Sequence, residues 1–323
     1  PAPSESGRGG RGVVTGRSGR RFGLALAAVV ALAVAIRLVF GSMIAPDLDS
    51  ASDVHWYRNM ASHLAAGDGM VVDEMGLDGQ LVPNGRPPEA TAKHPPLHPT
   101  VLAVSDFVGL DSWTEQRVVL ALIGGLGVAL LGLAGRDLLS PRVGLAAAGI
   151  AAVHPLWFQS PGLLTAEATY MPLTAGIIWV FARASRRWTV PGAVVLGALA
   201  GAAALTRAEA LVLAPLLGVA VVAVGDRAQR RRRFVLALVL VMCAGAVVAP
   251  WVMRNRSRVE ASQVSTNGGV TLLGANCETT YRGSQIGTFN FGCALGGGAA
   301  LDFEGRDPAN ASEGQLDRWL REM

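Results

Sequence analysis

Residues 22–43 read FGLALAAVVALAVAIRLVFGSM, an apolar segment in which Arg37 is the one charged residue. An α-helix needs about 20 residues to cross the hydrocarbon core of a bilayer, and this segment reaches that length. Secretory signal peptides have a shorter apolar stretch of about 7–15 residues. The segment therefore predicts a membrane-spanning helix near the start of the chain.

The composition indicates that most of the chain lies in a membrane. Hydrophobic residues make up 51% and charged residues 16% of it, whereas about 25% of the residues in soluble domains are charged. Because of this, we expect an all-α polytopic membrane protein, in which residues 22–252 form the transmembrane module. The shorter spans are expected to be tilted, partial or broken helices. Further apolar segments follow the first at 117–135, 143–158, 165–182, 190–205, 208–225 and 234–252.

Arginines mark alternate connections between these segments, and short cytoplasmic loops carry the positive excess. The pattern predicts a cell-membrane protein with a cytoplasmic amino terminus, a disordered basic tail over residues 1–21, and outer segments at 44–116 and 253–323. The pI of about 9.4 does not indicate nucleic-acid binding, because these arginines lie at membrane boundaries and not on one soluble face. They are Arg17, Arg20, Arg21, Arg136, Arg142, Arg183, Arg186, Arg187, Arg227 and Arg230 to Arg233.

The first outer segment has the highest density of reactive side chains. Asp53, Tyr57, Ala61 and Leu64 recur at helical spacing, and Gly67 and Gly69 are expected to end that helix. A carboxylate here suits a general base that withdraws a proton from an acceptor hydroxyl. The alternative is that Asp53 caps the helix together with Ser52. The spacing alone does not decide between the two.

Four short motifs carry a resemblance to a known family. They are Asp53-x-x-x-Tyr57-x-x-x-Ala61-x-x-Leu64-x-x-Gly67, then His94-Pro95-Pro96-Leu97-His98-Pro99, then Leu205-Thr206-Arg207-Ala208-Glu209, and finally Pro250-Trp251-Val252-Met253-Arg254-Asn255. In this order and membrane placement they resemble the GT-C fold glycosyltransferases of the protein mannosyltransferase and aminoarabinose transferase type, glycosyltransferase family 39.

The resemblance implies a GT-C-like helix bundle that transfers a hexose or pentose from a polyprenyl-phosphate donor at the outer face, with inversion. The acceptor is a hydroxyl of a protein, lipid or glycan, and Asp53 takes the position of the catalytic aspartate. These families commonly carry an Asp-Glu pair, whereas Val54 follows Asp53 here. The acceptor class and the metal dependence therefore stay open.

Three cations are candidates to bind the donor phosphate, since charges at membrane depth are costly and often functional. They are Arg207, Arg254 and Lys93, the only lysine in the chain. The alternatives are an ion pair between Arg207 and Glu209, interfacial placement of Arg254, and compositional bias for Lys93. The residues expected to line the substrate cavity are Tyr57, His94, His98, Glu167 and Glu209; helix-start preference also explains Glu167.

Histidines and cysteines raise two further expectations. His55, His94 and His98 are weak candidates for a divalent metal, although the prolines around His94 and His98 argue against a regular helix there. Cys277 and Cys293 are expected to form a disulfide in the loop-rich outer segment, whereas Cys243 lies in an apolar span.

Two other functional classes fit a polytopic membrane protein. A secondary transporter is the alternative, but its usual repeated halves are not apparent in the sequence. An intramembrane hydrolase needs a nucleophile paired with a histidine inside a span, which the apolar segments do not offer. The chain begins without Met and ends in a helix-like stretch, so we expect a fragment.

Overall fold

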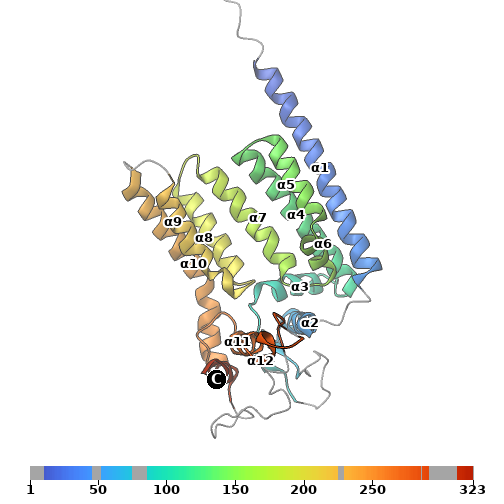
Figure 1. The fold of residues 1–323 in the computed structure, drawn as a ribbon, viewed down its shortest axis with the longest axis vertical. Coiled ribbons are helices and arrows are strands. Elements are labelled where there is room, and N and C mark those ends of the chain that lie inside the picture. Colours follow the sequence, from blue (N-terminus) through green and yellow to red (C-terminus); the bar gives the residue numbers. More distant parts are fainter. Residues whose placement is uncertain are drawn as a thin grey trace, which may run out of the picture. The chain divides into compact units, whose positions relative to one another are not determined.

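The computed structural model describes residues 11–45, 52–74, 86–224, 229–284, 286–290 and 311–322. These residues are mainly helical, with one small antiparallel sheet in which β1 (Val71–Val72) pairs with β2 (Glu89–Ala90). The chain divides into two compact units, residues 1–49 with 112–192 and residues 50–111 with 193–323. The helical architecture confirms the predicted all-α membrane class (Figure 1).

The first unit is a bundle of apolar helices in which α4 packs against α1, α5 and α7. Its core includes Phe22, Leu26 and Val128, together with alanines of α5. Small residues permit close backbone approach, as is common between membrane helices: a Cβ on Gly144 would lie 2.4 Å from the Gly132 carbonyl oxygen. The helices are α1 (Arg11–Met43), α4 (Trp113–Leu138), α5 (Pro141–Val153), α6 (Pro155–Gly162) and α7 (Glu167–Ala184).

Arg37, the charge inside the first apolar segment, caps a broken helix in this unit. Its side chain is buried, and its guanidinium donates to the carbonyl oxygens of Ala151 and Ala152 at 3.4 Å. Pro155 has no N–H, so it cannot donate to the Ala151 carbonyl as an ordinary helical residue would. Arg37 therefore supplies a donor at the position where the proline removes one.

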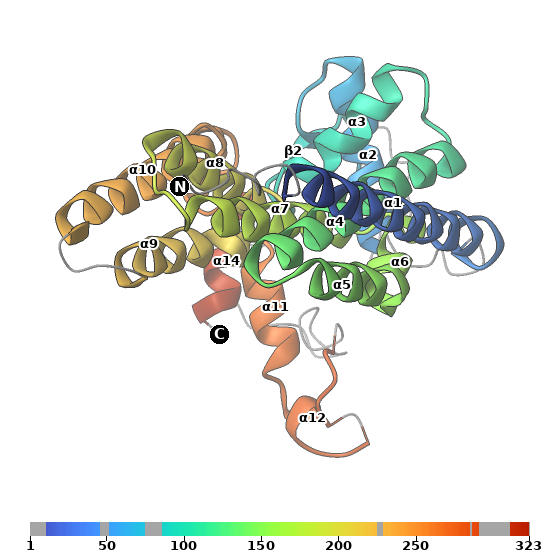
Figure 2. The same ribbon diagram turned by 90° about the horizontal axis from the view of Figure 1, so that it is seen from above.

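The second unit contains an apolar helix group and smaller elements. Among the apolar helices, η2 (Ala208–Val212) leads into α9 (Leu213–Ala223), which packs on α10 (Arg230–Arg258), while α8 (Val190–Ala204) begins at the end of the first unit (Figure 2). Gly197 brings α8 close to α10, because a Cβ there would lie 2.3 Å from the Leu240 carbonyl oxygen. The smaller elements are β1, β2, α2 (Ser52–Ala66), α3 (Leu97–Phe107), α11 (Gly268–Ala275), α12 (Glu278–Tyr281) and α14 (Glu313–Glu322).

The structure corrects several predicted boundaries. Three helices in the described part are long and apolar enough to cross a membrane: Gly19–Met43, Trp113–Leu138 and Arg230–Arg258. The segment predicted at 143–158 is two helices, because Pro155 starts α6 directly after α5. The one predicted at 208–225 begins as a 3-10 helix.

The expected terminal segments also differ from the structure. α1 begins at Arg11, so residues 11–21 of the predicted disordered tail are helical, whereas residues 1–10 lie outside the described part. α10 continues to Arg258, beyond the predicted end of the membrane module at residue 252. In its described residues, the segment that we expected to be loop-rich contains the helices α11, α12 and α14.

Candidate active site

Asp53 lies in the first turn of α2, with a side chain that is 52% exposed. Val54, Tyr57 and Ala61 are buried further along α2, whereas Asp53 remains half-exposed at the start of the helix. Gly67 ends the helix with a φ of +92°, as the sequence predicts. A carboxylate in the first turn also interacts favourably with the helix dipole. The buried position of Val54 shows why an apolar residue follows the aspartate.

The loop from Lys93 to Pro96 brings a second set of side chains beside α2. α3 begins at Leu97, directly after Pro96, and packs on α2. Our expectation that these prolines exclude a regular helix is wrong for His98, because a proline is tolerated in the first turn of a helix. The Leu97 amide donates to the Leu205 carbonyl oxygen at 2.8 Å, which joins this loop to the end of α8.

Two histidines pack on the ring of Tyr57. The ring centroids of His94 and His98 lie 4.7 Å and 4.9 Å from that of Tyr57, with edge-to-face geometry. All three side chains are buried, so Tyr57 and His98 form a support behind His94 and not the wall of an open cavity. Nε2 of His94 lies 3.6 Å from Oδ1 of Asp53, which is contact without a regular hydrogen bond. Burial lowers the pKa of His94 to about 3, so its imidazole is neutral at physiological pH.

Two cations influence the Asp53 carboxylate. Burial raises the pKa of Asp53, and the positive charges of Lys93 and Arg207 oppose that rise. The Lys93 ammonium lies 4.0 Å from the centroid of the Trp56 ring, in cation–π geometry. Arg207 precedes η2 and forms an ion pair through Nε with Glu209, which was the alternative interpretation of this arginine. The pair leaves 37% of the Arg207 side chain exposed.

Arg254 holds the loop instead of facing Asp53. Its guanidinium donates to the carbonyl oxygens of Thr91, at 2.6 Å, and Met70, and it lies over the Trp251 ring at 4.8 Å. Arg254 thus lies near the end of α10, as the interfacial alternative expects, and it also donates hydrogen bonds to the loop backbone. A contact between Arg254 and the donor phosphate, as expected from the sequence, would require Arg254 to give up these hydrogen bonds.

Glu313, at the start of α14, holds the same loop from another side. Its carboxylate accepts hydrogen bonds from the Ala92 amide at 3.0 Å, from the Thr91 hydroxyl at 3.3 Å and from the Thr266 hydroxyl. Burial raises the pKa of Glu313, while these hydrogen bonds and the charge of Lys93 lower it. Arg254 and Glu313 together fix the backbone that carries Lys93.

Trp56 and Glu313 were missed in the sequence. The Trp56 position is one helical turn from Asp53, so a search of that helix face for aromatic groups would have found it. For α14, the capping pattern Ser312-x-x-Gln315 indicates a helix start, and both of its reciprocal hydrogen bonds are present. We find no local signal that links Glu313 to a loop more than 200 residues earlier.

The remaining candidates are Glu167, His55 and the cysteines. Glu167 starts α7 in the first unit, as the helix-start alternative suggests. His55 follows Asp53 by two residues on α2, a spacing that turns it to another face. Within the described ranges, no group of three or more His, Cys, Asp or Glu side chains could hold a metal ion.

Cys243 is a free cysteine, and the Cys277 to Cys293 disulfide stays a prediction because Cys293 lies outside the described residues.

Comparison with protein families gives a match over a segment that begins at Lys93, so Asp53 lies outside it. Residues 93–253 match the family model of dolichyl-phosphate-mannose-protein mannosyltransferases. This segment is therefore similar to mannosyltransferase-type membrane glycosyltransferases. The match begins at Lys93 and includes Arg207, and it confirms the family resemblance read from the motifs. Comparison of the chain with curated proteins gives no match.

Proposed function

We propose that this glycosyltransferase moves a sugar from a polyprenyl-phosphate donor to a hydroxyl group, with Asp53 as the general base. The observation that carries the proposal is the cluster of one half-exposed carboxylate with two cations, Lys93 and Arg207, in a chain of this family. A hexose, with mannose as the first candidate, follows from the description of the family that matches.

In the proposed reaction, the acceptor oxygen attacks the anomeric carbon on the face opposite the phosphate. As the new carbon–oxygen bond forms, the acceptor proton passes to a carboxylate oxygen of Asp53. The bond between the anomeric carbon and the phosphate oxygen breaks, and its electron pair leaves with the lipid phosphate. Inversion at the anomeric carbon follows from this single displacement.

The cations stabilise the leaving group of the proposed reaction. A glycoside hydrolase needs a carboxylic acid to protonate the departing oxygen, whereas a phosphate departs as an anion and needs positive charge beside it. Lys93 and Arg207 meet this requirement, because fixed cations stabilise charge that develops in a transition state. Trp56 orients the Lys93 ammonium, and the neutral His94 packs beside Asp53 without adding a charge.

The raised pKa of Asp53 suits its proposed role. A general base is most effective when its pKa approaches the pH at which it works, and burial moves the carboxyl in that direction. In this proposal Arg254 and Glu313 are positioning residues, since they bind the backbone of the loop and not the reacting atoms.

We further propose that this cluster faces the outer side of the membrane, as the arginine distribution predicts. Asp68 is exposed in the same segment, with 55% of its side chain accessible. Replacing Asp68 with Cys in intact cells should permit labelling by a membrane-impermeant thiol reagent added outside. Labelling that requires permeabilised cells would place the segment inside.

The direct test of the activity uses the purified full chain in proteoliposomes with polyprenyl-phosphate mannose and a panel of protein, glycan and lipid acceptors. The expected result is a covalent mannosylated product, detected by mass spectrometry, and release of polyprenyl phosphate. Polyprenyl-phosphate arabinose in a parallel reaction distinguishes hexose from pentose transfer. Movement of a sugar across the vesicle membrane without covalent product would contradict the proposal and favour a transporter.

A further inference from the structure

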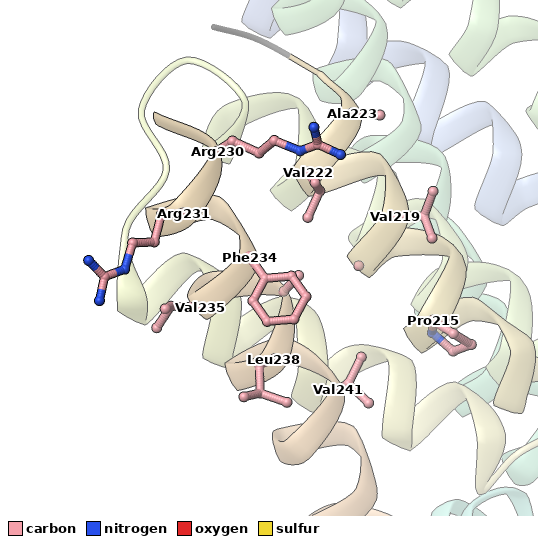
Figure 3. A pocket seen from close by; sticks show the side chains of 12 residues that line it. Pro215, Val219, Val222, Ala223, Arg230, Arg231, Phe234, Val235, Leu238 and Val241 are labelled. Atoms are coloured by element: carbon pink, nitrogen blue, oxygen red, sulfur yellow. The ribbon is translucent and has the colours of Figure 1, made fainter. Parts of the chain in front are cut away.

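A large apolar groove lies between α9 and α10 in the second unit, with a volume of about 1210 Å³. Figure 3 shows its wall, where Phe234, Leu238 and Val241 of α10 face Pro215 and Val219 of α9. Phe234 is 63% exposed and Val219 is 67% exposed. Such large apolar side chains at a groove surface indicate contact with lipid in a membrane protein.

One end of the groove is strongly basic. Arg230 and Arg231 line it at the start of α10, and Figure 3 shows Arg230 extending across toward Val222 and Ala223 at the end of α9. Two exposed arginines at one end of an apolar groove favour a ligand that has both an anionic and an apolar part.

The length of the groove matches one leaflet of a bilayer. The residues of α10 from Arg230 to Val241 span about 16 Å at a rise of 1.5 Å per residue, which is close to half of the roughly 30 Å hydrocarbon core. A phosphate group at the arginines would therefore lie at the membrane surface, with an acyl chain along Phe234 and Leu238.

The groove is separate from the Asp53 cluster. Arg230 and Arg254 lie near opposite ends of α10 and are about 36 Å apart along the helix axis. Arg254 holds the loop that carries Lys93. A phosphate at Arg230 therefore lies about the thickness of a bilayer core away from the proposed donor phosphate.

We propose that this groove binds an anionic glycerophospholipid, with its phosphate at Arg230 and Arg231 and one acyl chain between α9 and α10. The complementary charge at one end and the match to a single leaflet carry the assignment. Gly218 lies in the apolar part of the groove, where an added Cβ would meet only ordinary contacts, 3.5 Å from Val241 and 3.7 Å from Ala237. A small residue thus leaves room there for the chain.

The test is native mass spectrometry of the full chain released from micelles that contain equal amounts of phosphatidylglycerol and phosphatidylcholine. The unchanged protein should retain phosphatidylglycerol in preference. In the double variant Arg230→Gln/Arg231→Gln, retention should fall roughly 30-fold, because the lipid phosphate loses its charged contact with each of the two arginines. The matched control is Arg256→Gln/Arg258→Gln, which removes two exposed arginines from the other end of α10 and should retain the lipid.

A second pair of variants tests where the acyl chain binds. Gly218→Leu should fill the groove and reduce retention, whereas Gly149→Leu, where a Cβ meets nothing within 4 Å, should not. Equal retention of both phospholipids would mean that the protein retains bulk lipid only, and it would overturn the proposal. Equal losses of phosphatidylglycerol in the two double arginine variants would overturn it as well. Displacement of phosphatidylglycerol by equimolar polyprenyl phosphate would overturn it too, since the groove would then belong to the donor. Sugar transfer is not part of this measurement, so it is independent of the proposed activity.

Discussion

Buried or half-buried cations occur in both units, but their partners differ. Arg37 in the first unit donates to the backbone carbonyls of Ala33, Ala151 and Ala152, and its side chain is 1% exposed. Lys93 in the second unit lies over the Trp56 ring, and its charge acts on Asp53, which is half-exposed. A cation that satisfies backbone carbonyls maintains the fold, whereas one beside an accessible carboxylate is available to a substrate.

The largest effect on turnover should come from Asp53→Asn. Loss of a general base typically lowers the rate about 10²- to 10⁴-fold, while the amide is nearly the same size and leaves α2 intact. Single-turnover transfer from polyprenyl-phosphate mannose measures this effect. Asp68→Asn removes an exposed carboxylate from the same segment and serves as the control; a similar loss in both variants would remove the distinction that we draw for Asp53.

Lys93→Met should come next. It keeps the apolar length of the side chain and removes the charge, so the donor phosphate loses a charged contact, and we expect donor binding to weaken about 10- to 150-fold. Equilibrium binding of polyprenyl phosphate to the purified variant measures this loss. Unchanged affinity would mean that Lys93 serves the fold alone, as Arg37 does.

Arg254→Met should have a smaller effect on transfer. The variant loses the hydrogen bonds to the Met70 and Thr91 carbonyl oxygens, so the Lys93 loop shifts and kcat/KM falls on the order of tenfold. Arg256→Met on the same helix is the matched control, because Arg256 is exposed. A loss confined to donor affinity and as large as that of Lys93→Met would instead favour direct phosphate contact by Arg254.

Arg37→Met should leave turnover per folded molecule unchanged. It leaves the Ala151 and Ala152 carbonyls without their donor, so the free energy of unfolding should fall by about 1.5–3 kcal/mol. Thermal unfolding in detergent and the specific activity of the folded fraction separate the two quantities. A drop in specific activity with normal thermal stability would show that Arg37 has a role in transfer.

The sequence predicts local features well because they depend on local spacing. The helix from Asp53 to its end at Gly67 follows from residues that are neighbours in the chain. The break between α5 and α6 could have been predicted, because Pro155 has no N–H to donate within a helix. We did not use this signal when we assigned residues 143–158 to a single span.

Contacts between distant segments were not accessible in the same way. The carbonyls that Arg254 binds belong to Met70 and Thr91, and any residue presents such a carbonyl. Glu313 reaches Ala92 across most of the chain, so no periodicity links the two. The association of Asp53 with Lys93 and Arg207 was expected from the placement of these charges near the membrane boundary and from the resemblance of the motifs to a family.

The most direct test of the central claim is the pH dependence of kcat/KM for the unchanged protein and for Lys93→Met. Asp53 must be deprotonated to accept a proton, so kcat/KM should fall as the pH drops through its pKa in the free enzyme. Burial raises that pKa and the charge of Lys93 lowers it, so removal of Lys93 should move the acid limb of the profile to higher pH. An acid limb at the same pH in both proteins, or one that persists unchanged in Asp53→Asn, would contradict the assignment of Asp53 as the base beside Lys93.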